Sequence, residues 1–233
     1  MKPLLRYLRR KLWILLGKDI RPKIQIKLKG ECYGSDYGGW TVLPELINPE
    51  SIIYSFGVGE DASWDLAMIE KFKVTIHAFD PTPKSIQWIQ KQKFPEQFIF
   101  HPYGLAGIDG EVSFNPPENP EHVSHTILDR PQTRNQAIKV PVFRLSTIMK
   151  KLGHHKIDIL KMDIEGAEYQ VIEDLLQSGI FVKQLLIEFH HRFPNVGVQK
   201  TKDAIKLLND ASYAIMAVSR SGEEYTFIKT PIH

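Results

Sequence analysis

The ends of two apolar runs carry the side chains best suited to chemistry. Asp163 follows the run Ile157-Asp-Ile-Leu-Lys-Met162, and Glu188 and His190 close the run that begins at Gln184. If both runs are strands, alternation along the second places Glu188 and His190 on one face. An unperturbed imidazole has a pKa near 6.5, so His190 could take a proton from a hydroxyl group. We therefore predict that Asp163 and His190 act together in catalysis.

Other interpretations of this group of residues stay open. Glu165 lies at the start of an expected helix, where a carboxylate can also serve as a cap. We include Glu165 and Glu188 among the catalytic candidates. Asp163, Glu188 and His190 also offer hard oxygens and one imidazole, a ligand set for a divalent metal that could activate a hydroxyl. A site without a metal is the interpretation that we favour.

A turn with two glycines follows an earlier apolar run. Gly57 and Gly59 stand directly after the run Ser51–Phe56, and this spacing allows a tight turn close to a ligand. The next run, Val74–Phe79, ends in Asp80, whose carboxylate can accept both hydroxyls of an adenosine ribose. The residues expected to bind such a cofactor are Ser55, Gly57, Gly59, Glu60, Asp61, Asp80, Thr82 and Leu105.

The charge at this turn distinguishes two cofactor classes. A nicotinamide dinucleotide places its pyrophosphate at the N-terminus of the following helix. Glu60 and Asp61 would repel those phosphates, but they suit the ammonium and the sulfonium of S-adenosylmethionine. We therefore expect S-adenosylmethionine. An NAD-dependent oxidoreductase remains an alternative, because Ala62 could replace the third glycine of a dinucleotide pattern. Glu60 and Asp61 could also cap the following helix, whichever of the two cofactors binds.

These side chains need a sheet whose strands end at one edge. Strands are predicted at 51–56, 74–79, 97–101, 157–162 and 184–189, and helices at about 62–72, 83–92 and 200–210, with one more after 162. Alternating strands and helices imply parallel strands joined by right-handed crossovers. Ligands bind at the carboxyl ends of such strands, which is where the glycines and acids lie.

The last two apolar runs break the alternation. Residues 213–218 and 224–228 are separated by Ser219-Arg-Ser-Gly-Glu223, which is too short for a helix. Parallel strands cannot be joined in this way. We predict an α/β fold of the Rossmann-like class I methyltransferase type, with a mostly parallel seven-stranded sheet that ends in an antiparallel hairpin.

Several segments resemble the FkbM-type methyltransferase family. They are Tyr54-Ser-Phe-Gly-Val-Gly-Glu-Asp61, His77-Ala-Phe-Asp-Pro-Thr-Pro83, Leu160-Lys-Met-Asp-Ile-Glu-Gly-Ala-Glu168 and Leu186-Ile-Glu-Phe-His190, with Tyr33–Trp40 upstream. The resemblance covers about 33–230. It implies a Rossmann-like fold, S-adenosylmethionine, and O-methylation of a sugar or natural-product hydroxyl. Many class I methyltransferases carry an acid where this chain has Ser55, so Glu60, Asp61 or Asp163 would have to bind the ammonium.

The positive charge is concentrated in the first thirty residues. They hold ten Lys and Arg against Asp19 alone, a local charge of +9, and the remainder carries −6. A mildly acidic body argues against a nucleic-acid partner. We predict an amphipathic basic extension at 1–30 and a methyltransferase domain at 31–233. A helix within 1–18 either packs its leucines on the domain, which we favour, or contacts a membrane surface.

The remaining expectations concern the acceptor and the location. Residues 115–136 hold four prolines and little periodicity, which predicts a loop near the strand ends that could cover a substrate. The expected substrate is a small-molecule or glycan hydroxyl. The five-residue apolar run at 12–16 is too short to span a bilayer, which needs about 20 residues, so a cytoplasmic location is expected. A non-catalytic, membrane-associated binding module is the second alternative.

Overall fold

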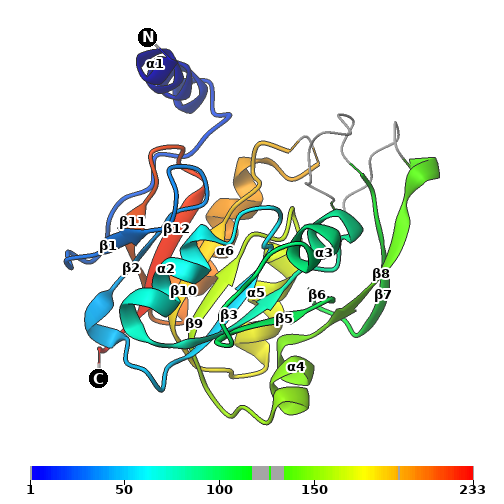
Figure 1. Ribbon diagram of the computed structural model, residues 1–233. Helices are drawn as coiled ribbons and strands as arrows, with labels where there is room; N and C mark the ends of the chain where they lie inside the picture. Colours follow the sequence, from blue (N-terminus) through cyan, green and yellow to red (C-terminus); the bar gives the residue numbers. More distant parts are fainter. Residues whose placement is uncertain (1, 117–125, 127–133, 194, 233) are drawn as a thin grey trace.

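A seven-stranded sheet forms the centre of the molecule. The computed structural model describes residues 2–116, 126, 134–193 and 195–232, with the backbone alone for residues 2–8. The strand order is β11-β12-β10-β9-β3-β4-β5 (Figure 1). The strands are β3 (Ile52–Phe56), β4 (Thr75–Phe79), β5 (Phe98–His101), β9 (Ile157–Met162), β10 (Val182–Glu188), β11 (Tyr213–Val218) and β12 (Glu224–Lys229).

The direction of the strands follows the predicted rule. The pairs β3–β4, β4–β5, β3–β9 and β9–β10 are parallel. Only β12 runs against its neighbours, because the short connection from β11 forces an antiparallel hairpin. The predicted Rossmann-like sheet and its final hairpin are therefore confirmed. The sequence did not predict that β12 would insert between β10 and β11.

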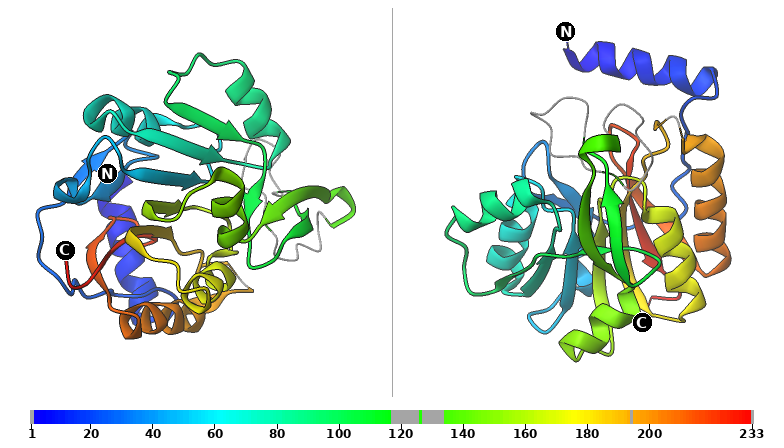
Figure 2. Two further views of the ribbon diagram at one scale, coloured as in Figure 1. Left: turned by 90° about the horizontal axis from the view of Figure 1, so that it is seen from below. Right: turned by 90° about the vertical axis from the view of Figure 1, so that its right-hand side faces the viewer.

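Helices cover both faces of the sheet, as Figure 2 shows. The helices are α2 (Ser63–Phe72), α3 (Pro83–Gln90), α4 (Leu145–Leu152), α5 (Glu168–Gln177) and α6 (Gly197–Asp210). Apolar side chains of α4, α5 and α6 share one core with one face of the sheet, and those of α2 and α3 share the other. All six residues of β9 are buried. This central strand thus has a protein layer on each side, which fixes where its carboxyl end can lie.

Two smaller sheets and one helix were absent from the sequence-based prediction. A three-stranded sheet contains β6 (Gly104–Leu105), β7 (Gly110–Phe114) and β8 (Ile138–Phe143), and a hairpin contains β1 (Glu31–Tyr33) and β2 (Trp40–Val42). The missed helix is α4, and short 3₁₀ turns occur at Pro44–Leu46 and Arg134–Gln136. Most of the predicted loop at 115–136 lies outside the described residues. Its described part includes Asn115 and Thr126, which pair as an antiparallel bridge beyond β7.

The N-terminal segment forms the predicted helix, α1 (Lys2–Leu15), which projects from the body (Figure 1). The favoured prediction that its leucines pack on the domain is wrong for Leu12, Leu15 and Leu16, which are 53%, 82% and 57% exposed. Polar contacts attach the helix instead: Arg10 lies 3.8 Å from the Asp19 carboxylate, and its guanidinium donates to the carbonyl of Arg220. No helix in the described part of the chain is both long and apolar enough to cross a bilayer.

Candidate active site

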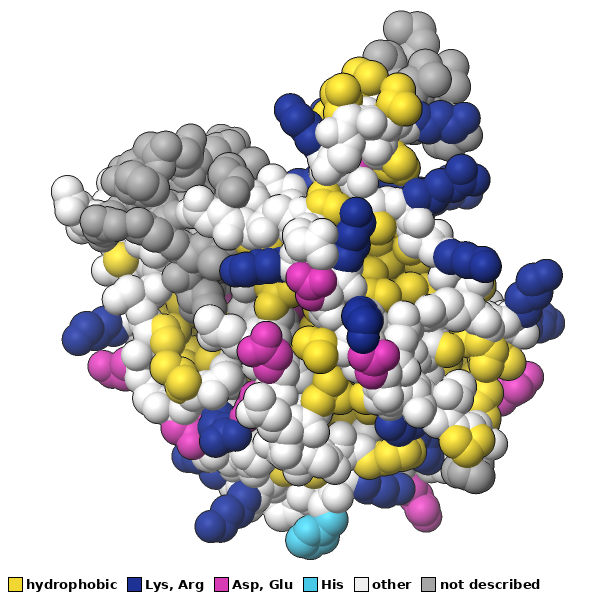
Figure 3. All heavy atoms as spheres, turned by 180° about the vertical axis from the view of Figure 1, so that it is seen from behind, with side chains coloured by type: hydrophobic (Ala, Val, Ile, Leu, Met, Phe, Trp, Pro, Cys, Tyr) yellow, Lys and Arg dark blue, Asp and Glu magenta, His cyan; other side chains and the backbone are white. Residues whose placement is uncertain are grey.

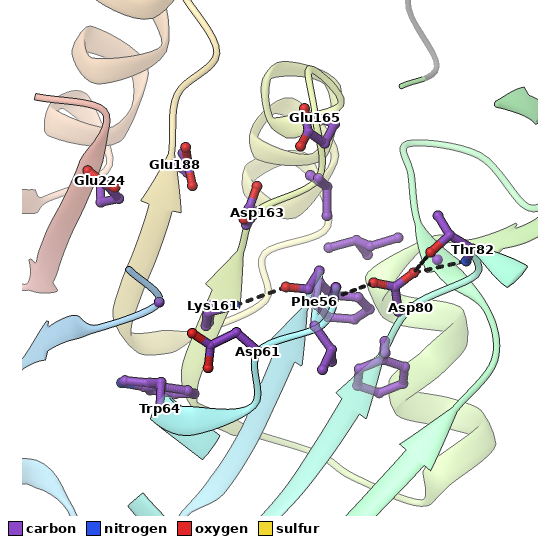
Figure 4. Close-up of a pocket in the computed structure, with 18 of the residues that line it drawn as sticks. Phe56, Asp61, Trp64, Asp80, Thr82, Lys161, Asp163, Glu165, Glu188 and Glu224 are labelled. Atoms are coloured by element: carbon purple, nitrogen blue, oxygen red, sulfur yellow. Dashed lines mark hydrogen bonds between the residues drawn. The ribbon is translucent and has the colours of Figure 1, made fainter. Parts of the chain in front are cut away.

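A cavity of about 950 Å³ opens at the carboxyl ends of β3, β4, β9 and β10. This volume lies at the upper end of the range of about 300–1,000 Å³ that is usual for small-molecule sites. Figure 4 shows polar side chains on both sides of the β3 carboxyl end. The sequence-predicted residues that line the cavity are Gly57, Gly59, Glu60, Asp61, Asp80, Thr82, Leu105, Asp163, Glu165, Glu188 and His190.

The turn after β3 is held against the end of β9. Gly57 has φ +81°, and a Cβ atom there would lie 1.9 Å from the carbonyl oxygen of Asp163. No other residue fits this position, because both the conformation and the space exclude a side chain. The close approach brings the glycine turn and the first acid of the catalytic group to one wall of the cavity.

Asp80 is fixed by three hydrogen bonds at one end of the cavity. Its Oδ2 accepts from the Gly59 amide at 2.9 Å, and its Oδ1 accepts from the amide and the hydroxyl of Thr82 at 2.9 and 2.7 Å. A carboxylate offers about four acceptor positions. One acceptor position therefore remains on Oδ2. The prediction that Asp80 accepts from both ribose hydroxyls needs two such positions.

The two acids of the glycine turn have different surroundings. Asp61 accepts from the Ser63 amide at 2.7 Å and from the Ser35 hydroxyl at 2.7 Å, so it caps α2. Burial opposes its charge, but these hydrogen bonds hold the pKa of Asp61 below its usual value. Glu60 lies 3.6 Å from the Lys84 ammonium. A charged carboxylate at the N-terminus of α2 would repel a pyrophosphate there. Ser55 is fully buried and is not part of the cavity wall.

The opposite end of the cavity gathers the catalytic candidates around one imidazole. The Nε2 atom of His190 lies 3.4 Å from Glu165, 3.7 Å from Asp163 and 3.9 Å from Glu188, each measured to a carboxylate oxygen. Its Nδ1 atom lies 2.8 Å from Oε1 of Glu168, which is fully buried. The structure thus brings all four predicted catalytic residues together and adds Glu168 behind the imidazole.

The electrostatics of this cluster determine which groups hold protons. Burial alone would lower the pKa of His190, but the charge and the hydrogen bond of Glu168 help to raise it well above the usual value. His190 is therefore protonated near neutral pH when no other cation is present. Burial and the charge of Asp163 raise the pKa of Glu188 well above its usual value, and burial raises that of Asp163. Such carboxylates accept a proton more readily than ordinary surface acids.

Other residues of the cavity were not predicted as site residues. Lys161 is 5% exposed; its ammonium donates to the carbonyl of Gly57 at 3.3 Å and lies 5.4 Å from the ring centroid of Trp40. A lysine inside an otherwise apolar strand was the signal that could have identified it. Tyr37, Glu223 and Glu224 also line the cavity. Their hairpins carry no pattern that places them beside β9.

One described residue of the 115–136 segment reaches this end of the cavity. Thr126 is buried, and its hydroxyl donates to the backbone carbonyl of Glu165. The same Glu165 has φ +52°, an uncommon conformation for a residue with a side chain. The segment therefore contacts the backbone that carries one of the predicted catalytic acids.

Comparison with known proteins identifies relatives. The chain matches the model of the methyltransferase FkbM domain over residues 45–215. It is 24% identical over 163 residues to the "probable methyltransferase-like protein 24" of Homo sapiens, covering 69% of this chain and 38% of that protein. It is 24% identical over 161 residues to the "hexuronic acid methyltransferase AglP" of Haloferax volcanii, covering 65% of this chain and 63% of that protein. The chain thus spans less than two thirds of the length of these relatives.

Among solved structures, the chain is similar to the pre-rRNA processing protein fibrillarin of Methanococcus jannaschii. The TM-score is 0.47 at 12% sequence identity, and the alignment covers 81% of this chain and 69% of that one. The predicted family rests instead on the FkbM model, which matches well over half of the chain, in the part that holds most of the cavity residues. The chain belongs to the FkbM methyltransferase family.

Proposed function

We propose that this protein transfers a methyl group from S-adenosylmethionine to a hydroxyl oxygen of a sugar or a related small molecule. The observation that carries the proposal is that the cavity has two polar ends of different composition. A hydrogen-bonded Asp80 lies at one end, and the acids Asp163, Glu165 and Glu188 lie at the other (Figure 4). The hexuronic acid named for the archaeal relative supports a sugar as the acceptor.

The residues at the Asp80 end fit S-adenosylmethionine. The remaining acceptor position of Asp80 suits a ribose hydroxyl, and the glycine turn lets the ligand approach the backbone. Asp61 is charged and lies where an ammonium can be bound. When bound, this cofactor supplies a methyl carbon activated by a sulfonium. The protein must then hold the acceptor oxygen in line with that carbon and the sulfur.

The acidic end suits the acceptor. Carboxylates form strong hydrogen bonds with hydroxyl groups and can take the single proton that the reaction releases. His190 holds a proton in this arrangement, so the proton acceptor is one of the carboxylates, and we assign Asp163, which lies against the Gly57 turn. This assignment changes the role of His190 from general base to the group that orients the acids.

The nicotinamide alternative has weaker support. Asp61 caps the helix at which a pyrophosphate would bind, and the FkbM family match describes methyltransferases. A purely structural cavity, as in a non-catalytic binding module, would not need several acids that face one buried imidazole, because unpaired charges in such a place cost stability.

The cofactor assignment predicts the behaviour of Asp80 variants. Asp80→Ala should weaken the binding of S-adenosylhomocysteine by about 1.5–3 kcal/mol, since it removes hydrogen bonds to a charged group. Calorimetric titration measures the loss, which corresponds to roughly 10- to 150-fold. Because Asp80 also accepts from Gly59 and Thr82, the melting temperature should be recorded, and Asp80→Asn serves as the conservative variant. Unchanged affinity in a folded Asp80→Ala protein would remove Asp80 from the site.

The activity prediction concerns Asp163. A library of glycans and small hydroxyl compounds incubated with the protein and S-adenosylmethionine should yield a product that is heavier by one methylene group in mass spectrometry. With that acceptor, Asp163→Asn should lower turnover by about 10²–10⁴, the range for a lost general base, while S-adenosylhomocysteine binds nearly as before. A wild-type rate in Asp163→Asn would show that another group takes the proton.

We also propose that α1 contacts an anionic membrane surface. Leu12 and Leu15 are exposed on a helix that projects from the body, Leu16 is exposed directly after it, and basic side chains stand beside this helix (Figure 3). Apolar residues next to basic ones are the combination that binds an anionic bilayer surface. The +9 charge of residues 1–30 adds long-range attraction to such a surface.

Vesicle binding tests this contact. The full chain should bind vesicles that contain phosphatidylserine at low salt and should bind neutral phosphatidylcholine vesicles far less. The triple variant Leu12→Ser, Leu15→Ser and Leu16→Ser should lose at least about tenfold in affinity, because a buried leucine contributes about 1.5–3 kcal/mol. Phe181→Ser is the matched control, since Phe181 is 51% exposed on the body. If the full chain ignores anionic vesicles, or the control weakens binding equally, α1 is not a membrane contact.

A further inference from the structure

We infer that the acidic end of the cavity is a binding site for a divalent, oxygen-preferring cation, held by Asp163, Glu165 and His190. The inference rests on the proposed function for its purpose, because the ion would lie where the acceptor hydroxyl must bind. The experiment that tests the inference does not depend on that function, because it measures the binding of the ion alone. The ligand set differs from the sequence-based alternative in one member: Glu165 takes the place of Glu188.

The distances suit a single ion. One ligand atom from each of the three residues can be chosen so that all lie within 4.8 Å of one another. Opposite ligands of a bound magnesium ion are about 4.2 Å apart, since each bond measures about 2.1 Å. By this comparison, the three side chains would have to move by less than about 1 Å to bind one ion. Glu188 is not one of these three residues, and its carboxylate lies 3.9 Å from Nε2 of His190.

The orientation of His190 points independently to a ligand. His190 is 6% exposed, so its side chain has little contact with water. Its Nε2 atom faces the carboxylates at 3.4 to 3.9 Å, longer than the roughly 2.7–2.9 Å of a charge-assisted hydrogen bond. A nearly buried nitrogen is thus aimed into the cluster with none of these carboxylates at hydrogen-bond length.

Glu168 supplies the support that metal-binding histidines generally have. Its Oε1 lies 2.8 Å from Nδ1 of His190 and accepts from the Gly166 amide at 3.0 Å. A metal-ligating histidine almost always donates its other nitrogen to a carboxylate or a carbonyl, which fixes the ring and its tautomer. With Nδ1 held in this way, the Nε2 lone pair is the one available to an ion.

The local charge also requires a cation. Asp163, Glu165, Glu168 and Glu188 surround one imidazole. The ammonium of Lys161, which also lines the cavity, is directed to the carbonyl of Gly57. A divalent ion would neutralise this excess of carboxylates far better than one imidazolium does. Oxygen ligands with a single imidazole and no thiolate favour magnesium or manganese over zinc.

The ion would assist the proposed transfer at the acceptor oxygen. It would stabilise that oxygen as the O–H bond breaks and the proton passes to a carboxylate of the cluster. The oxygen forms a bond to the methyl carbon as the bond from carbon to sulfur breaks. The products are the methyl ether, S-adenosylhomocysteine and one proton.

The test measures manganese binding in the absence of cofactor and acceptor. After treatment with EDTA and its removal, the full chain is titrated with Mn²⁺, and the free ion is followed by electron paramagnetic resonance. We expect one Mn²⁺ per chain. Glu165→Gln and His190→Gln should each weaken binding at least tenfold, and Glu168→Gln, a positioning variant, by about 10- to 100-fold. Glu173→Gln, an exposed acid on α5, is the matched control and should bind as the wild type does.

The possible outcomes test the cation site and the methyl transfer separately. Absence of a bound Mn²⁺, or binding that Glu165→Gln and His190→Gln leave unchanged, overturns the cation site. S-Adenosylhomocysteine binding measured in EDTA reports on the fold of each variant, so a variant that fails to fold is recognised and the remaining variant decides. If methyl transfer continues in EDTA while Mn²⁺ does not bind, only the cation site fails. If Mn²⁺ binds in the expected pattern and no acceptor is methylated, only the proposed function fails.

Discussion

The contact between Gly57 and the carbonyl of Asp163 is the constraint on which the site depends. A Cβ at Gly57 would lie 1.9 Å from that oxygen, so the two strand ends can meet only because position 57 has no side chain. The same loop reaches Asp80, whose carboxylate accepts from the Gly59 amide, and both Asp80 and Asp163 line the cavity. One backbone contact therefore sets the spacing between the two ends of the cavity. A methyl donor and its acceptor need such a fixed spacing, because displacement at carbon tolerates little misalignment.

Charge divides this cavity into two environments. At the Asp80 end, Asp80 and Asp61 accept hydrogen bonds from backbone amides and hydroxyls, which hold the pKa of Asp61 below its usual value against the effect of burial. At the other end, several carboxylates gather around His190, with Asp163 and Glu165 at 3.7 and 3.4 Å from its Nε2 atom. The first environment is complete without a ligand, whereas the second is stabilised by anything that brings positive charge or hydroxyl donors. This contrast underlies the proposed division of the cavity into a cofactor end and an acceptor end.

The sequence was sufficient for the large sheet and for the polar residues at the ends of its strands. Segments such as 157–162 are mostly apolar, and a parallel sheet collects their carboxyl ends at one edge, so Asp80, Asp163 and His190 had to meet there. The sequence was insufficient where the position of a residue depends on pairing between strands that are distant in the chain. The insertion of β12 beside β10 brings Glu223 and Glu224 to the cavity, and nothing in the spacing of the hairpin specifies that neighbour.

Burial accounts for the other differences. Glu168 looked like one of several acids at the start of a helix, but it is fully buried behind His190, and only the packing of α5 against the end of β10 reveals this. Ser55 had the right place in the chain for a cofactor contact, yet it lies below the cavity wall. The leucine pattern of α1 predicted the helix correctly. It could not predict that polar contacts at Arg10 would attach it in place of leucine packing.

The end of β10 connects these polar contacts with the site. His190 turns into the cavity, whereas the next residue, His191, turns away and lies 3.1 Å from the buried carboxylate of Asp19. Arg192 donates to the same carboxylate at 2.6 Å, and its guanidinium carbon lies 5.4 Å from the ring centroid of Trp13 in α1. The segment that orients His190 is thus held on its other side by the chain that leads to α1.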